Sequence, residues 1–183
     1  MVIEEDTGQI WLWGWNIGYS LGVDMPPIVP SGFPPVTRPH DVVHVWLPIK
    51  PVRSGAFTGA NIIAIGAGYD TSYAVDNRGH VWAWGDNRFS QFGVGPDIVK
   101  QDLKAHRVHG LSDIMSLSAG SYHCLALGGD GTLWSWGSNG SGQVGQALVI
   151  GPDAPPGQVA RLDHVSAYSA GHQHSLAIGH RPE

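Results

Sequence analysis

Residues 128–139 read GGDGTLWSWGSN, and the same pattern is written two more times along the chain. The other copies are DNRGHVWAWGDN at residues 76–87 and DTGQIWLWGWN at residues 6–16. In each copy the two aligned tryptophans stand two positions apart, so they share one face of an extended strand. The Gly before them suits a tight hairpin turn, because Gly adopts positive φ without strain. Repetition of one strand pattern indicates an architecture of repeated β units.

A second pattern alternates with the first and consists of an apolar stretch, Ala-Gly and a short strand. Its copies cover residues 62–75, 114–127 and 165–178. Gly68, Gly120 and Gly171 follow one another at intervals of 52 and 51 residues. Short alternating runs bounded by Gly, Asn and Asp predict strands. Four strands per roughly 50 residues, repeated radially, are typical of a β-propeller, so the predicted class is all-β.

The combined pattern is Gly-x-x-His-x-Leu-Ala-Leu followed by Asp-Gly-x-Leu-Trp-x-Trp-Gly-x-Asn-x-x-Gly-Gln-x-Gly. It closely resembles the repeat of the regulator of chromosome condensation family. Residues 119–145 match nearly every position, whereas residues 67–93 depart at Thr71 and Ser90. The resemblance implies propeller blades built from these repeats. Because they recur, six tryptophans are expected to pack the blades: Trp11, Trp13, Trp82, Trp84, Trp134 and Trp136.

The order of the repeats predicts a particular division of the chain. We expect a half-blade at residues 1–22, a Pro-rich linker at 23–60, blades at 61–112 and 113–162, and a half-blade at 163–183. Within the linker, residues 42–47 read as a strand. About three blades are fewer than the four to eight of typical propellers. Either the chain is a fragment of a longer propeller, or a second copy completes a six-bladed ring as a homodimer, which we favour.

Composition excludes several classes of function. A net charge of -5 without a run of Lys or Arg argues against nucleic-acid binding. No apolar run approaches the roughly 20 residues of a membrane span. The acidic start at residues 1–6 does not read as a secretory signal, which favours a cytoplasmic location.

The motifs that resemble catalytic or ligand sites have structural interpretations. The Gly-x-Gly-x-x-Gly at residues 140–145 is not followed by a helix, so a turn is the better interpretation than a dinucleotide site. His172 and His174 could ligate a metal, but His174 shares its repeat position with His123, which favours structural hydrogen bonds. No nucleophile-elbow motif is present. We therefore expect no enzyme activity, no cofactor and no metal.

Chain direction places the Gly-x-x-His loops and the loops after each Trp strand on one face. Binding residues commonly lie on such loops, although ordinary loop residues would give the same pattern. The candidate partner-binding residues are Trp15, Tyr19, Tyr69, Asp70, Arg88, Phe89, Tyr122, His172, Gln173 and, in the linker, Trp46.

The leading prediction is a non-catalytic scaffold that binds another protein through this face. The alternative is a carbohydrate-binding propeller, since exposed aromatic loops also stack on sugars. Guanine-nucleotide exchange, which the resemblance also suggests, is less favoured because the chain has few repeats and no basic tail.

Overall fold

The computed structural model describes residues 1–4, 9–22, 44–49, 60–95 and 97–181. In these parts the regular elements are strands, apart from one 3-10 turn, η1 (Ile17–Tyr19). The predicted all-β class is confirmed.

Two complete antiparallel blades form the centre of the molecule. The first has the strand order β4 (Ile62–Ala67), β5 (Thr71–Asp76), β6 (Val81–Asp86) and β7 (Gln101–Arg107). The second has the order β8 (Ile114–Ala119), β9 (His123–Gly128), β10 (Leu133–Ser138) and β11 (Asp153–Gln158). The register repeats as well, because Trp82 lies opposite Ala74 and Trp134 opposite Ala126.

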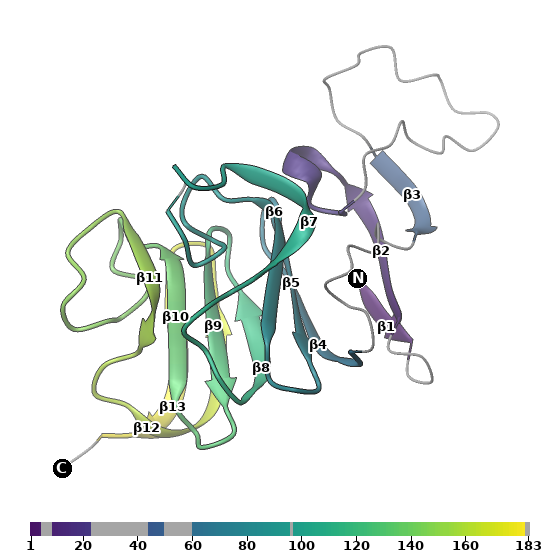
Figure 1. The fold of residues 1–183 in the computed structure, drawn as a ribbon. Coiled ribbons are helices and arrows are strands. Elements are labelled where there is room, and N and C mark those ends of the chain that lie inside the picture. The colour runs from purple at the N-terminus through teal and green to yellow at the C-terminus, as the bar shows by residue number, and fades with distance from the viewer. Residues whose placement is uncertain (5–8, 23–43, 50–59, 96, 182–183) are drawn as a thin grey trace.

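Smaller sheets flank the two blades, so that the sheets stand side by side around one axis (Figure 1). On the N-terminal side, β1 (Val2–Glu4), β2 (Gln9–Trp15) and β3 (His44–Ile49) form a three-stranded sheet. On the C-terminal side, β12 (Asp163–Ala170) and β13 (Ser175–His180) pair alone among the described residues. The sequence placed a linker strand at residues 42–47; β3 begins two residues later, and residues 42–43 lie outside the described parts.

In the two complete blades, the second tryptophan of the Trp-x-Trp pair joins the blade to the preceding sheet. Trp136 is fully buried, and its Nε1 donates a hydrogen bond to the carbonyl oxygen of Gln91 at 2.8 Å. Its ring packs edge-on against Tyr73, with centroids 6.0 Å apart. Trp84 is buried in a separate apolar cluster together with Leu12 of β2. The interpretation as blade-packing residues is confirmed for these two tryptophans but is wrong for Trp13, which is 43% exposed.

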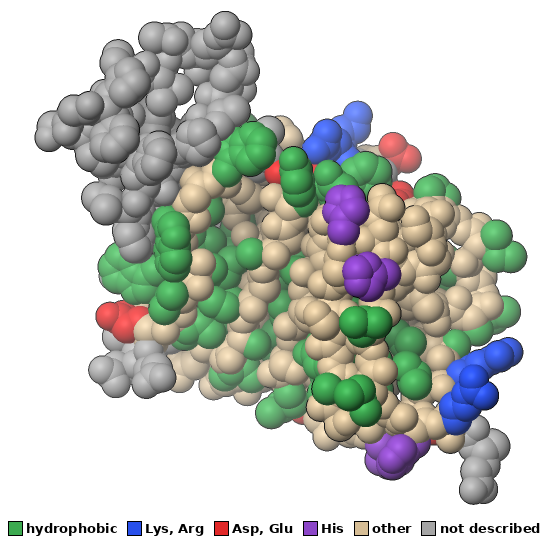
Figure 2. All heavy atoms as spheres, turned by 180° about the vertical axis from the view of Figure 1, so that it is seen from behind, with side chains coloured by type: hydrophobic (Ala, Val, Ile, Leu, Met, Phe, Trp, Pro, Cys, Tyr) green, Lys and Arg blue, Asp and Glu red, His purple; other side chains and the backbone are tan. Residues whose placement is uncertain are grey.

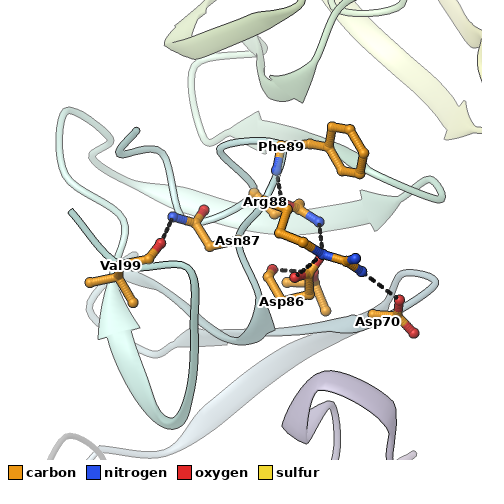
Figure 3. Close-up of polar contacts among 8 residues, drawn as sticks. Asp70, Asp86, Asn87, Arg88, Phe89 and Val99 are labelled. Carbon is orange, nitrogen blue, oxygen red and sulfur yellow. Dashed lines mark hydrogen bonds and ion pairs between the residues drawn. The ribbon is translucent and has the colours of Figure 1, made fainter. Parts of the chain in front are cut away.

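A recurring Asn holds the loop that follows each Trp strand. The Asn87 Oδ1 accepts a hydrogen bond from the Phe92 backbone N–H at 2.7 Å, and its Nδ2 donates to the Val99 carbonyl oxygen at 2.6 Å (Figure 3). Asn16 makes the equivalent bond to the Leu21 N–H at 2.8 Å. These side chains satisfy backbone groups that the loop leaves unpaired, and so they fix the loops that carry the candidate site.

Candidate functional site

Four aromatic side chains form a continuous row over three neighbouring sheets. Trp15, at the end of β2, meets Tyr69 at 6.5 Å between ring centroids, and Tyr69 meets Tyr122 at 5.7 Å. Phe89 meets the same Tyr122 at 4.8 Å. We call these four residues the aromatic row. Trp15, Tyr69 and Phe89 remain 44%, 55% and 39% exposed, so the row offers a broad apolar surface to solvent.

A charged triad lies beside the aromatic row. The Arg88 Nε donates to the Asp86 Oδ1 at 2.8 Å, and its terminal nitrogen lies 3.6 Å from the Asp70 Oδ2 (Figure 3). Both carboxyl groups are buried, whereas Arg88 is 62% exposed at the surface. Two acids and one base give the triad a formal charge of −1 when all are ionised.

The burial of the triad perturbs its protonation equilibria. Burial raises the pKa of Asp70, the neighbouring Asp86 carboxylate raises it further, and Arg88 opposes both effects. The hydrogen bond to Asp86 raises the pKa of Arg88, which keeps that guanidinium charged. Burial, and then the charge of Asp70, raise the pKa of Tyr122. The triad and the aromatic row are therefore electrostatically coupled.

The other predicted site residues are not members of the row, although His172 lines one pocket together with Tyr69. His172 is exposed, and its Nδ1 lies 2.6 Å from the Ser121 Oγ of the neighbouring loop. Gln173 is exposed and lines a cavity between the second blade and β13. Tyr19 is half-buried in η1, where its φ is 65°. Trp46 lies on β3, and its side chain is outside the described residues.

One feature of the site was not recognised from the sequence, namely the pairing of Asp86 with Asp70. The two acids are adjacent because β5 and β6 pair up to Thr71 and Gly85, and the Asp86 N–H then donates to the Asp70 carbonyl oxygen at 2.8 Å. Extending the hairpin register by one residue would have placed the two acids side by side.

A buried histidine links the second blade to the last strand pair. The His123 Nε2 lies 2.9 Å from the Ser175 Oγ, which donates to the Gln143 carbonyl oxygen at 2.7 Å. Burial, and to a lesser extent His174, lower the pKa of His123 from 6.5 to about 4. The predicted structural role of this histidine matches these bonds.

We expect acidification to destabilise the protein through His123. The pKa of His123 is lower in the folded chain than in the unfolded chain. The unfolded chain therefore binds more protons between about pH 6.5 and about pH 4, and the free energy of unfolding decreases as the pH is lowered through this window. From about pH 7.5 to about pH 5 the predicted loss is about 2 kcal/mol. Urea unfolding at both pH values measures this loss. His123→Thr introduces the residue that the first blade has at the same repeat position, Thr71, and should remove most of the pH dependence. If the variant keeps the pH dependence of the wild type, His123 is not its origin.

The described residues form neither a metal site nor a membrane-spanning helix. No group of three potential metal-ligating side chains comes together within the described ranges. No helix in those ranges is long and apolar enough to cross a membrane. The face shown in Figure 2 has hydrophobic side chains near charged ones at its upper edge.

The sequence matches two profiles of the Regulator of chromosome condensation (RCC1) repeat. One matches residues 62–91 and 115–143, and the other matches residues 78–127 and 130–178. The chain belongs to the RCC1 repeat family. Among its relatives, Protein pim1 of Schizosaccharomyces pombe is 38% identical over 78% of this chain and 26% of its own length. Guanine nucleotide exchange factor SRM1 of Saccharomyces cerevisiae is 32% identical over 70% of this RCC1-repeat chain and 28% of SRM1.

A further relative and two solved structures complete the comparison. The probable E3 ubiquitin-protein ligase HERC6 of Homo sapiens is 33% identical over 62% of this chain and 11% of its own length. The structure of Prp20p from Saccharomyces cerevisiae superposes with a TM-score of 0.74 at 18% identity, covering 96% of this chain and 40% of Prp20p. Human WBSCR16 gives 0.70 at 20% identity, covering 94% of this chain and 41% of that one. These structures confirm the propeller fold, and the RCC1-repeat chain spans less than half of each relative.

Proposed function

We propose that the protein is a non-catalytic scaffold that binds another protein through the aromatic row. The observation that carries the proposal is the continuity of the row across three sheets. Tyr, Trp and Arg are enriched among residues that dominate binding energy at interfaces, and Arg88 stands beside the row. Asn87 fixes the loop that carries Phe89, and Asn16 fixes the loop after Trp15, so these parts of the surface lose little conformational entropy on binding.

The relatives are compatible with a role in protein binding. Prp20p was studied for its binding to Gsp1p and histones, and yeast RCC1 was crystallised bound to Kap60. This chain has a net charge of -5, so a partner of its acidic triad should carry basic groups near the apolar contact. Nucleic acid does not fit a surface of that sign.

Substitution within the aromatic row tests the proposal. Tyr69→Ala combined with Phe89→Ala should weaken binding of a stoichiometric protein partner, captured from extracts of the source cells, by at least about tenfold. Ile98→Ala is the control, because Ile98 is an apolar side chain that is 73% exposed and is not one of the four residues of the row. Calorimetry with the purified partner measures both affinities. Equal affinity for the double variant and the control would show that the row is not the binding surface.

Two other functions compete with protein binding. A carbohydrate ligand is the alternative that the exposed rings of Trp15 and Tyr69 favour, since sugars stack on such rings. A glycan array that gives signals lost in Tyr69→Ala would replace protein binding by this function. Guanine-nucleotide exchange, the activity in the name of SRM1, is a less favoured proposal for this chain.

We propose in addition that the chain self-associates, two copies closing one ring. The two-stranded sheet β12–β13 supports this, since β13 has one paired edge among the described strands. Unpaired strand edges promote association, and two-fold symmetry is the most common in homo-oligomers. Light scattering at micromolar concentration measures the mass, and a monomer would contradict the proposal.

A further inference from the structure

The side chain of Trp136 fills a space lined by the first blade, and the second blade lines a corresponding cavity. We call this cavity the socket. A cavity of about 320 Å³ opens beside β13. The residues that line it include Gln143 and five apolar residues, Leu125, Leu133, Val144, Val159 and Leu162. Because cavities of about 150 Å³ already hold benzene, this one has room for an indole ring.

The lining of the cavity matches the surroundings of Trp136 position by position. In the first blade the corresponding repeat positions are Tyr73, Val81, Gln91, Phe92, Val108 and Leu111, and the five apolar ones share a core cluster with Trp136. Backbone bonds confirm the alignment, since Val108 N–H donates to the Val81 carbonyl and Val159 N–H donates to the Leu133 carbonyl, both at 2.8 Å. The cavity is therefore shaped as a tryptophan socket.

The polar end of the socket also fits an indole N–H. The Gln91 carbonyl oxygen accepts two hydrogen bonds, from Trp136 Nε1 at 2.8 Å and from Tyr73 OH at 3.2 Å. The Gln143 carbonyl oxygen accepts one from the Ser175 Oγ at 2.7 Å. A carbonyl oxygen has two lone pairs, so Gln143 can accept a second bond from an indole that enters the cavity.

The chain itself carries an exposed tryptophan at the matching repeat position. Trp13 of β2 corresponds to Trp84 and Trp136, yet it is 43% exposed, whereas those two are 1% and 0% exposed. Leu12, its neighbour in sequence, points to the opposite face and is buried against the first blade. Trp13 thus faces outward from the N-terminal sheet and cannot reach the socket at the other end of the same chain, because both blades lie between them (Figure 1).

We propose that the socket binds Trp13 of a second copy of this chain, with β2 of that copy added to β13. This inference rests on the proposed self-association and assigns its contact. The registers of β5–β6 and β9–β10 place Ser72 opposite Trp84 and Cys124 opposite Trp136. Ser175 occupies the same repeat position as Ser72 and Cys124, so it would lie opposite the incoming Trp13. A two-fold arrangement gives two such seams and closes the ring.

The N-terminal strand β1 must move aside for this contact. It pairs with Gln9, Ile10 and Trp11, on the edge of β2 that β13 would use. β13 has six residues against the three of β1, and it would also reach Leu12, Trp13 and Gly14. Docking therefore exchanges a short pairing for a longer one and buries an exposed tryptophan at the same time.

The test measures solution mass by light scattering for the wild type, Trp13→Ala, Ala177→Arg and a control, Ala147→Arg. Ala177 is an exposed residue lining the socket, and Ala147 is an exposed loop residue outside it. We expect dimers for the wild type and the control. For Trp13→Ala and Ala177→Arg we expect the dissociation constant of the dimer to be at least about tenfold higher. An equal mixture of the two weakened variants should form a heterodimer, because one retains the socket and the other retains Trp13.

Each other outcome overturns a definite part of the inference. A wild type that is monomeric at micromolar concentration contradicts self-association itself. A dimer that both substitutions leave unchanged contradicts the socket but not self-association. Monomeric variants that do not complement each other contradict the pairing of Trp13 with the socket. A monomeric wild type that binds a QIWLWGW peptide assigns the socket to another chain. Circular dichroism of every variant confirms that it is folded.

Discussion

Replacing Trp136 with Ala is expected to lower the free energy of unfolding by about 3–5 kcal/mol. Trp136 is fully buried and joins the two complete blades through Tyr73 and the Gln91 carbonyl oxygen. Removing the indole opens a cavity between the blades and leaves that carbonyl with one fewer donor. The loss is comparable to much of the stability of a typical domain, so the variant should be partly unfolded well below the melting temperature of the wild type.

Two further variants separate the contributions of the indole. Trp136→Phe retains most of the ring but loses the N–H, so we expect a smaller loss of about 1–2 kcal/mol. Trp13→Ala removes the equivalent residue from an exposed position and, measured on dissociated chains, should cost under about 1 kcal/mol. Urea denaturation followed by fluorescence and circular dichroism measures all three. Equal losses for Trp136→Ala and Trp13→Ala would show that the packing between blades does not determine the stability.

The repeat pattern predicted the fold but not the burial of each copy. Trp13, Trp84 and Trp136 occupy one repeat position, and the sequence gives no reason to separate them. Their burial differs because each is covered by the blade that precedes it, and Trp13 has no such cover within the described residues. The burial of a repeated residue thus depends on whether a blade precedes its own, and the residues around it in the sequence do not contain that information.

The candidate site was predicted in part for a similar reason. Alternation of strands and loops placed Trp15, Tyr69, Phe89 and Tyr122 on one face, but which rings touch depends on the rotation between adjacent blades. His172 belongs to the same class of loop and lines one pocket together with Tyr69, whereas Gln173 lines a separate cavity beside β13. The burial of Asp70 arises from neighbouring segments, because Gly18 of η1 lies against it, and no motif reports such a contact.

Replacing Gly137 with Ala is expected to destabilise the protein by about 3 kcal/mol or more, because two costs combine. Gly137 has a φ of 98°, and this left-handed backbone costs residues with a Cβ about 1–2 kcal/mol. A Cβ at Gly137 would also lie 2.5 Å from the Tyr122 carbonyl oxygen and 2.9 Å from the His123 Cα. Both are backbone atoms of β9 and its loop, held by the Ser138 N–H bond to the same Tyr122 oxygen at 2.8 Å.

The chain contains its own control for the steric part of this effect. Gly14 occupies the same repeat position with a φ of 115°, but a Cβ there would meet nothing within 4 Å. Gly14→Ala should therefore cost only the conformational part, about 1–2 kcal/mol, and the difference in urea stability between the two variants measures the clash. Equal losses would contradict a steric origin. Because relief of the clash must displace Tyr122, Gly137→Ala should also weaken partner binding at the aromatic row, and unchanged affinity would contradict that displacement.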